Sequence, residues 1–141
     1  MPTIGAMAAP KTTPASLAMH ENDDVARELG IDIVAAEPGA ATVEMTVTGS
    51  MTNGLDVCHG GIIFALADTA MAHASNAAGD RTLSTSASIE WLRAVRVGER
   101  LVATSSVAAS RGRNTVHDVV VTVDGERVAL LRGQTLTLGA S

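Results

Sequence analysis

The sequence predicts an α+β fold in which an antiparallel sheet wraps around one long central helix. The segment over about residues 60–78 is long and apolar enough to form a helix that is buried on every side. Two shorter segments before it and four after it have the pattern of β-strands. A chain of 141 residues, 46% of them hydrophobic, is expected to form one domain around one core.

The N-terminal part divides into a tail and a first helix. Residues 1–17 are small and lack the apolar run of a secretory signal, so we expect a disordered tail followed by a folded domain over 18–141. A short helix is predicted over 18–29, because acidic residues favour its first turns and Gly30 suits its C-terminal end. Two strands follow, "IDIVAAEPG" and "AATVEMTVTG", which together predict a hairpin.

Four extended segments follow the long helix. "GDRT" is expected to turn the chain, and the dipeptide Asp124-Gly125 is a strong hairpin signal. The predicted strands cover residues 83–92, 100–110, 115–123 and 127–138. Helices and strands in this order indicate an antiparallel sheet that wraps around the central helix.

Composition excludes several function classes. The net charge is −5 and Phe64 and Trp91 are the only aromatic residues, which argues against a nucleic-acid-binding surface. The run 60–67 is too short to span a membrane, and Asp68 ends it. Cys58 is the only cysteine, in agreement with a reducing cytoplasm, and the histidines lack metal-ligand spacing. We therefore expect a cytoplasmic protein without a metal or a redox cofactor.

Asp68 stands out because it lies in the middle of the apolar helix. It is about eight residues inside the helix, so it cannot act as a cap. An unpaired carboxylate in such a position costs several kcal/mol, which suggests that it has a partner or a function. Partial burial is expected to raise its pKa toward the range of a general base.

A motif around this helix resembles a known family. The pattern N-G-x-x-x-C-H-G-G-x-x-x-x-L-A-D-T-A, from Asn53 to Ala70, resembles hotdog-fold acyl-CoA thioesterases of the phenylacetic-acid-degradation type. "SASIEWLR" over 86–93 and "RGR" over 111–113 extend the resemblance to about residues 20–139. It implies a hotdog fold and hydrolysis of phenylacetyl-CoA, a hydroxylated relative or a similar acyl-CoA, with coenzyme A as part of the substrate.

The resemblance also implies roles at the reacting carbonyl. Asp68 would activate water or attack the thioester itself, and the Gly60 N–H at the helix start would stabilise the oxyanion. Asn53 and His59 would position the thioester or the water. Their structural alternatives are a turn residue at Asn53 and a helix cap at His59.

Further residues are candidates for contacts with the substrate. Ser84 and Ser86 match positions that line the acyl or pantetheine channel, and Gly61 offers a second N–H beside Gly60. Arg111 and Arg113 are candidates for the coenzyme A phosphates, with solvated hairpin charge as the alternative.

Three other residues have weaker or undecided assignments. Arg93 is either an ion-pair partner or a coenzyme A contact. Cys58 is disfavoured as a nucleophile because its neighbour His59 points to the other side of an extended segment. His73 lies about 140° around the helix from Asp68 and is not expected to touch it.

The helix geometry predicts an active site shared between two chains. Gly60 and Asp68 are about 12 Å apart along the helix, whereas a hydrogen bond requires about 3 Å. If both act on one carbon, they come from two antiparallel helices related by a two-fold axis. This agrees with the family that the sequence resembles, whose subunits act as dimers that are usually paired into tetramers.

Two rival functions are a hotdog hydratase or dehydratase, and a non-catalytic acyl-CoA-binding protein.

Overall fold

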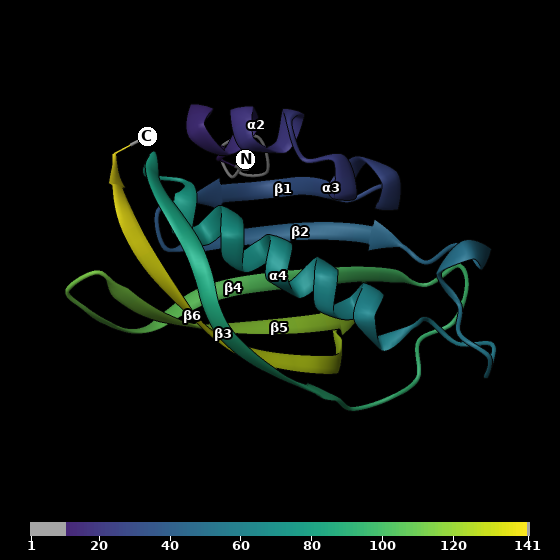
Figure 1. Cartoon of the computed structure of the whole chain (residues 1–141). Helices are drawn as coiled ribbons and strands as arrows, with labels where there is room; N and C mark the ends of the chain where they lie inside the picture. The colour runs from purple at the N-terminus through teal and green to yellow at the C-terminus, as the bar shows by residue number, and fades with distance from the viewer. Residues whose placement is uncertain (1–10, 141) are drawn as a thin grey trace, which may run out of the picture.

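A six-stranded antiparallel sheet curves around one long helix in the computed structural model, which describes residues 11–140 (Figure 1). The elements in chain order are α2 (Pro14–Glu21), α3 (Asp24–Leu29), β1 (Asp32–Glu37), β2 (Ala40–Thr46), the short 3-10 helix η1 (Gly49–Met51), α4 (Gly60–Asn76), β3 (Asp80–Trp91), β4 (Arg100–Arg111), β5 (Asn114–Val123) and β6 (Glu126–Ala140). The predicted fold, the central helix and the six strands are therefore confirmed.

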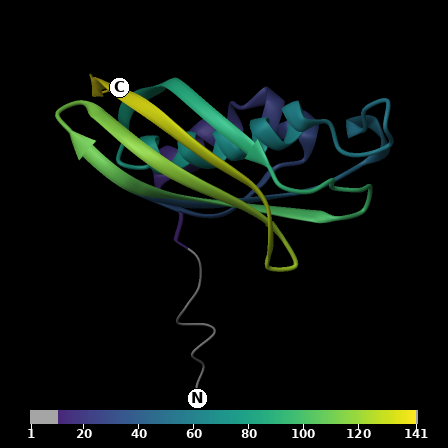
Figure 2. The ribbon, with the colours of Figure 1, turned by 90° about the horizontal axis from the view of Figure 1, so that it is seen from below.

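The strands are ordered β1-β2-β4-β5-β6-β3, so β1 and β3 form the two edges of the sheet. All neighbouring pairs are antiparallel. The predicted hairpin at Asp124-Gly125 is confirmed, since both residues adopt positive φ, 49° and 81°. Figure 2 shows that the helices lie on one side of the curved sheet.

The core lies between the sheet and one face of α4. Leu66 and Met71 of the helix are fully buried, together with strand residues such as Met45 and Val121. Met71 packs so close to Gly133 of β6 that an added Cβ there would lie 2.5 Å from its sulfur. This glycine lets the helix sit deep in the curve of the sheet.

The prediction that α4 is buried on every side is wrong for the single chain. Ala65, Asp68 and Ala72 are half-buried, whereas residues of the opposite face such as Ala70 are fully buried. The helix is apolar on both faces, but the sheet covers only one of them. The second face is left for another contact.

The prediction of one helix over 18–29 is also wrong, because the chain forms two short helices there. Asn22 ends α2, and its side-chain amide donates a hydrogen bond to the Ala18 carbonyl at 2.9 Å. Asp23 then caps α3, accepting a hydrogen bond from the Ala26 N–H at 2.9 Å. Two adjacent polar residues therefore close one helix and begin the next.

The predicted boundary between tail and domain at residue 17 differs from the structure. The Thr13 hydroxyl caps α2 and Pro14 occupies its first turn, which are common signals for a helix start. The Ala36 N–H of β1 donates to the Lys11 carbonyl at 2.7 Å, and the Thr13 N–H donates to the Ala36 carbonyl at 3.1 Å. Residues 11–17 thus belong to the domain, and the rest of the predicted tail, 1–10, lies outside the described residues.

Within residues 11–140, no helix combines the length and the apolar character needed to cross a membrane.

Candidate active site

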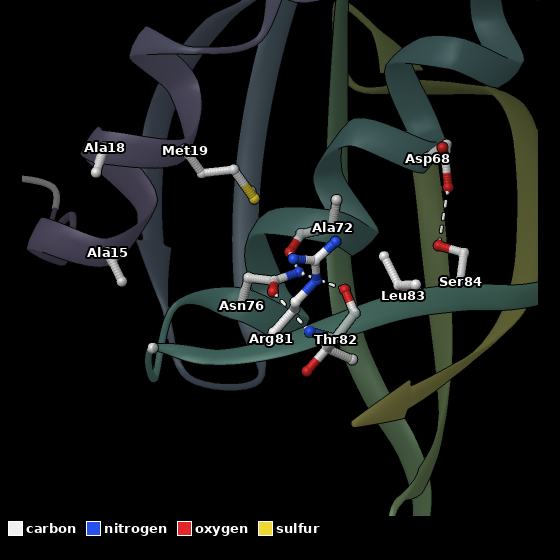
Figure 3. Close-up of a pocket in the computed structure, with 11 residues that line it drawn as sticks. Ala15, Ala18, Met19, Asp68, Ala72, Asn76, Arg81, Thr82, Leu83 and Ser84 are labelled. Atoms are coloured by element: carbon white, nitrogen blue, oxygen red, sulfur yellow. Dashed lines mark hydrogen bonds between the residues drawn. The ribbon is translucent and has the colours of Figure 1, made fainter. Parts of the chain in front are cut away.

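Asp68 lies in the middle of α4 and faces the first half of β3. Its carboxylate accepts a hydrogen bond from the Ser84 hydroxyl at 3.2 Å (Figure 3). Burial raises the pKa of the Asp68 carboxyl above its usual range, and the hydrogen bond from Ser84 only partly offsets this effect. The side chain is half-buried, so the carboxylate remains accessible from the cavity that it lines. A positioned carboxylate with a raised pKa is suited to act as a general base.

The start of α4 leaves one N–H group unused. His59 caps the helix: its Nδ1 accepts a hydrogen bond from the Gly61 N–H at 2.9 Å, and its carbonyl accepts from Ile62 and Ile63. Among the described residues, the Gly60 N–H has no partner. It lies at the positive end of the helix dipole, where an oxyanion would be stabilised.

The hydrogen bond between Gly61 and His59 means that only one of the two predicted glycines still has a free N–H among the described residues. Gly61 was expected to offer an N–H to the substrate, but that N–H is already donated to His59. Gly60 retains its N–H and therefore remains the candidate donor. The structural alternative for His59, a helix cap, is confirmed, and its Nε2 is left for other contacts.

Trp91, at the end of β3, covers Gly60. The indole N–H donates to the Gly60 carbonyl at 3.1 Å, and a Cβ added at Gly60 would lie 3.0 Å from the indole ring. The close approach of the ring explains why glycine stands at this position. The sequence contains Trp91 in the matched segment 86–93, but nothing in the pattern indicates its contact with Gly60.

Asn53 forms the turn that leads to the helix. Its side-chain oxygen accepts hydrogen bonds from the N–H groups of Leu55 and Val57, at 2.9 and 3.4 Å. The turn role is therefore confirmed. The side-chain NH₂ group has no partner among the described residues, so it can still reach a substrate.

Gly60 and Asp68 line different cavities of the chain. Asp68 lies in a cavity of about 830 Å³ between α2, α4 and β3. Gly60 lies in a cleft of about 300 Å³ that Trp91 also lines. One chain therefore does not bring the two residues to one carbonyl, as the ~12 Å offset along the helix predicts.

The other predicted contact residues, Ser86, Arg111 and Arg113, also lie away from Asp68 in the single chain. We call the β4–β5 turn with its two arginines the arginine hairpin. The pairing of β3 with β6 shifts register between Ser84 and Ser86, and Ser86 lines a separate cleft with Arg132. Arg111 and Arg113 flank the β4–β5 turn and are exposed, with no ion pair among the described residues. Ser84 is thus the only predicted contact residue that joins the Asp68 cavity.

The structure also shows the surroundings of the three undecided residues. Arg93 forms ion pairs with Glu99 and Glu126 at 3.1 and 3.0 Å, which favours the ion-pair interpretation. Burial raises the pKa of the Cys58 thiol, which disfavours a thiolate nucleophile. His73 is fully buried and packs against His20, with ring centroids 6.0 Å apart, rather than against Asp68.

Comparison with known proteins identifies the class. Residues 55–130 match the model of the thioesterase superfamily. The chain belongs to this superfamily, and with its hotdog fold it is a thioester hydrolase. Gly60 and Asp68 both lie within the matched residues, whereas Asn53 and α2 lie outside them.

Three matches to two PaaI proteins show which members of the superfamily the chain resembles. It is 42% identical over 125 residues to the acyl-coenzyme A thioesterase PaaI of Escherichia coli, which covers 88% of this chain and 89% of the relative. The structure of the E. coli PaaI protein from the phenylacetic acid degradation operon matches with a TM-score of 0.87 at 40% identity, over 90% of this chain and 93% of that one. A mutant of the PaaI protein of Thermus thermophilus matches with a TM-score of 0.79 at 30% identity, over 82% and 100% of the two chains.

Proposed function

We propose that the protein hydrolyses acyl-CoA thioesters of the phenylacetyl type, including hydroxylated phenylacetyl-CoA or a similar acyl-CoA. The similarity to an acyl-coenzyme A thioesterase from a phenylacetic acid degradation operon supports this substrate class. The observation that carries the proposal is the half-buried Asp68 carboxylate, held by Ser84 beside a cavity large enough for an acyl group.

The unused Gly60 N–H is the proposed oxyanion donor. The thioester carbonyl oxygen would accept its hydrogen bond, and negative charge would develop on that oxygen as the tetrahedral intermediate forms. The dipole of α4 adds to this stabilisation. Asn53 and His59 both precede the helix start, and the NH₂ group of the first and Nε2 of the second are proposed to position the thioester or the water.

Asp68 completes the reaction by one of two routes. As a general base, it takes a proton from water while the water oxygen attacks the carbonyl carbon. The carbon–sulfur bond then breaks, and the proton passes to the sulfur of coenzyme A. As a nucleophile, its oxygen attacks the carbon directly, coenzyme A leaves, and water hydrolyses the resulting anhydride. Single-turnover hydrolysis in ¹⁸O-labelled water tests the second route: label in Asp68 shows that an anhydride formed and that water attacked its Asp68 carbonyl carbon, whereas the general-base route places the label only in the product acid.

A dimer with shared sites is part of the proposal. β3 is an edge strand of 12 residues, and nearly all of its side chains are exposed. Such an edge offers unpaired N–H and C=O groups to another strand, and the half-buried face of α4 lies beside it. A two-fold axis at this edge would bring Gly60 of one subunit near Asp68 of its partner. Pairing of dimers into a homotetramer follows from the resemblance to the family.

The remaining contacts concern coenzyme A. Arg111 and Arg113 present two guanidinium groups on an exposed turn, without an ion-pair partner in the described part of the chain, which suits the phosphate groups of the nucleotide. The single cysteine, buried and unpaired, supports a reducing compartment such as the cytoplasm.

Release of free thiol from a panel of acyl-CoA thioesters tests the proposed function. We expect phenylacetyl-CoA or one of its hydroxylated or aliphatic analogues to be hydrolysed by the wild-type protein and not by Asp68→Asn. Absence of thiol release from the whole panel would reject the proposal. Hydrolysis that is equal in both proteins would reject the role of Asp68.

A further inference from the structure

The cavity beside Asp68 has walls from three elements that are separate in the sequence. α2 contributes Ala15, Ala18 and Met19, and α4 contributes one row of residues at four-residue spacing, Asp68, Ala72 and Asn76 (Figure 3). The third wall is formed by Gly79 and by residues 81–84 at the start of β3. The α4 row is about 12 Å long, so the cavity is long enough to hold an extended acyl chain.

The walls that one chain gives this cavity are mostly apolar. Its apolar side chains are those of alanine, methionine and leucine, and Leu83 is half-exposed. Among the described residues that line it, none is aromatic. This surface is suited to methylene groups, which gain free energy from any apolar contact.

Two opposite charges line the cavity. Asp68 lies at one end of the α4 row, and the Arg81 backbone lies at the Asn76 end, next to Thr82, which Asn76 binds. Figure 3 shows the Arg81 side chain extending along the helix toward Ala72. Within residues 11–140 its guanidinium forms no ion pair, whereas Arg93, Arg100 and Arg132 are each paired with a carboxylate.

A sheet irregularity places Arg81 on this wall. The pairing of β3 with β6 shifts between Arg81 and Thr82, where Leu138 of β6 has no partner. Such bulges increase the local twist and redirect side chains. Asn76 holds the strand in this position: its side chain accepts from the Thr82 N–H at 2.9 Å and donates to the Thr82 carbonyl at 3.0 Å. Asn76 is thereby occupied, which leaves Arg81 as the polar group available at this end.

We propose that the preferred substrate is an acyl-CoA whose aliphatic acyl chain ends in a carboxylate, and that Arg81 binds this carboxylate while the thioester lies at Asp68. The inference rests on the proposed hydrolysis of acyl-CoA thioesters and replaces the phenylacetyl group of the proposed substrate by a carboxylated aliphatic chain. The planar guanidinium matches a carboxylate through two parallel N–H···O bonds. Arg81 is therefore a specificity-determining residue that does not touch the reacting atoms.

Matched pairs of substrates test the inference. Glutaryl-, adipyl- and suberyl-CoA are each compared with the monocarboxylic thioester of equal length, pentanoyl-, hexanoyl- and octanoyl-CoA. In the wild type, kcat/KM should be higher for the carboxylated member of at least one pair. In Arg81→Gln, the ratio of kcat/KM within that pair should fall about tenfold, the scale of one charge-assisted interaction. Arg81→Lys should restore part of the ratio.

Arg127→Gln is the matched control, because it removes the same charge from an exposed arginine at the start of β6, outside the cavity. It should leave the ratio at the wild-type value. Equal losses for both members of a pair in Arg81→Gln would show that Arg81 binds coenzyme A or supports the fold, and would overturn the inference. An unchanged ratio would overturn it as well.

Binding of non-hydrolysable thioether analogues separates this inference from the proposed function. Calorimetry with carboxyalkyl-CoA and alkyl-CoA thioethers requires no catalysis. Tighter binding of the carboxylated thioether by the wild type, lost in Arg81→Gln, supports the inference even if no thioester is hydrolysed. Equal affinity for both thioethers overturns it, even if phenylacetyl-CoA is a good substrate.

Discussion

The Ser84 hydroxyl donates a hydrogen bond to the Asp68 carboxylate at 3.2 Å, and this contact joins the first half of β3 to the middle of α4. The bond orients one carboxylate oxygen and leaves the other for a water molecule or a thioester carbon. It also stabilises the ionised acid against the effect of burial. We therefore expect Ser84 to act on the reaction through Asp68.

Single substitutions of Asp68 and of Ser84 should lower turnover by different amounts. Asp68→Asn should lower kcat by about 10²-fold or more, because the amide can neither accept a proton nor attack. Ser84→Ala should lower kcat less, about tenfold, because the carboxylate remains but loses one hydrogen bond. Steady-state kinetics with circular dichroism as a folding control measure both. Turnover of Asp68→Asn near the wild-type value would contradict the catalytic role.

The raised pKa of Asp68 predicts that the same substitution stabilises the fold at neutral pH. The folded state holds the Asp68 proton more tightly than the unfolded state does, so the ionised acid costs stability once the pH exceeds its folded pKa. Asp68→Asn removes this cost, and its asparagine oxygen can still accept from Ser84. Urea unfolding should show the gain at pH 7 and no gain below the ordinary pKa of 3.8, where the acid is protonated in both states. A loss of stability at pH 7 would argue that burial does not disfavour the carboxylate.

His73 predicts a second pH dependence with the opposite sign. Burial, reinforced by the neighbouring His20, lowers the pKa of His73 from 6.5 to about 4. Neither ring nitrogen has a hydrogen-bond partner among the described residues. The unfolded chain therefore takes up the proton first, and stability falls as the pH decreases from about 6.5 to about 4, by about 3 kcal/mol.

The variant His73→Leu isolates the contribution of His73 to the pH dependence of stability. It keeps an apolar side chain of similar size at a fully buried position and removes the titrating ring. The difference in unfolding free energy between wild type and variant should change across this pH window in favour of the variant at low pH. A constant difference from pH 7 to pH 4 would contradict the prediction.

Mixing two inactive variants tests the shared site. Asp68→Asn and Gly60→Pro should each be inactive alone, since the first lacks the acid and the second lacks the N–H donor. After subunit exchange, about half of the dimers carry both variants, each with one intact site and one doubly altered site. About a quarter of wild-type activity should therefore return.

Gly60→Ala is the control for this experiment. A Cβ at Gly60 meets the Trp91 ring at 3.0 Å in both variants, but only proline removes the N–H. Gly60→Ala therefore measures the steric effect alone and should retain more activity than Gly60→Pro. If tagged subunits co-purify and the mixture stays inactive, Gly60 and Asp68 do not act in the same site.

The arginine hairpin predicts that its two charges affect only the binding of the nucleotide part of coenzyme A. Replacing both Arg111 and Arg113 by alanine should raise KM for an acyl-CoA by about tenfold, because two exposed charge-assisted contacts with phosphate are lost. KM for the same acyl group on a short pantetheine thioester should change by less than about twofold, since that substrate lacks the nucleotide. Equal changes with both substrates would show that these charges only face solvent.

The central helix, the six strands and the offset between Gly60 and Asp68 could be predicted from the amino-acid sequence alone. These features depend on local patterns: apolar periodicity, turn residues such as Asp124-Gly125, and the constant rise of a helix. The same local reasoning was wrong at Asn22 and Asp23. Either polar residue can begin a helix, and here one ends α2 while the other begins α3.

Which polar groups remain available to a substrate depends on the packing of the folded chain. The ring of His59 occupies the N–H of Gly61 rather than that of Gly60, and the Trp91 indole covers Gly60 from the far end of β3. Sheet register brings Ser84, but not Ser86, to Asp68. These contacts join residues up to 31 positions apart, and they depend on how strands and helices pack. Local sequence patterns do not encode that packing, because it is the sum of many weak apolar contacts across the whole core.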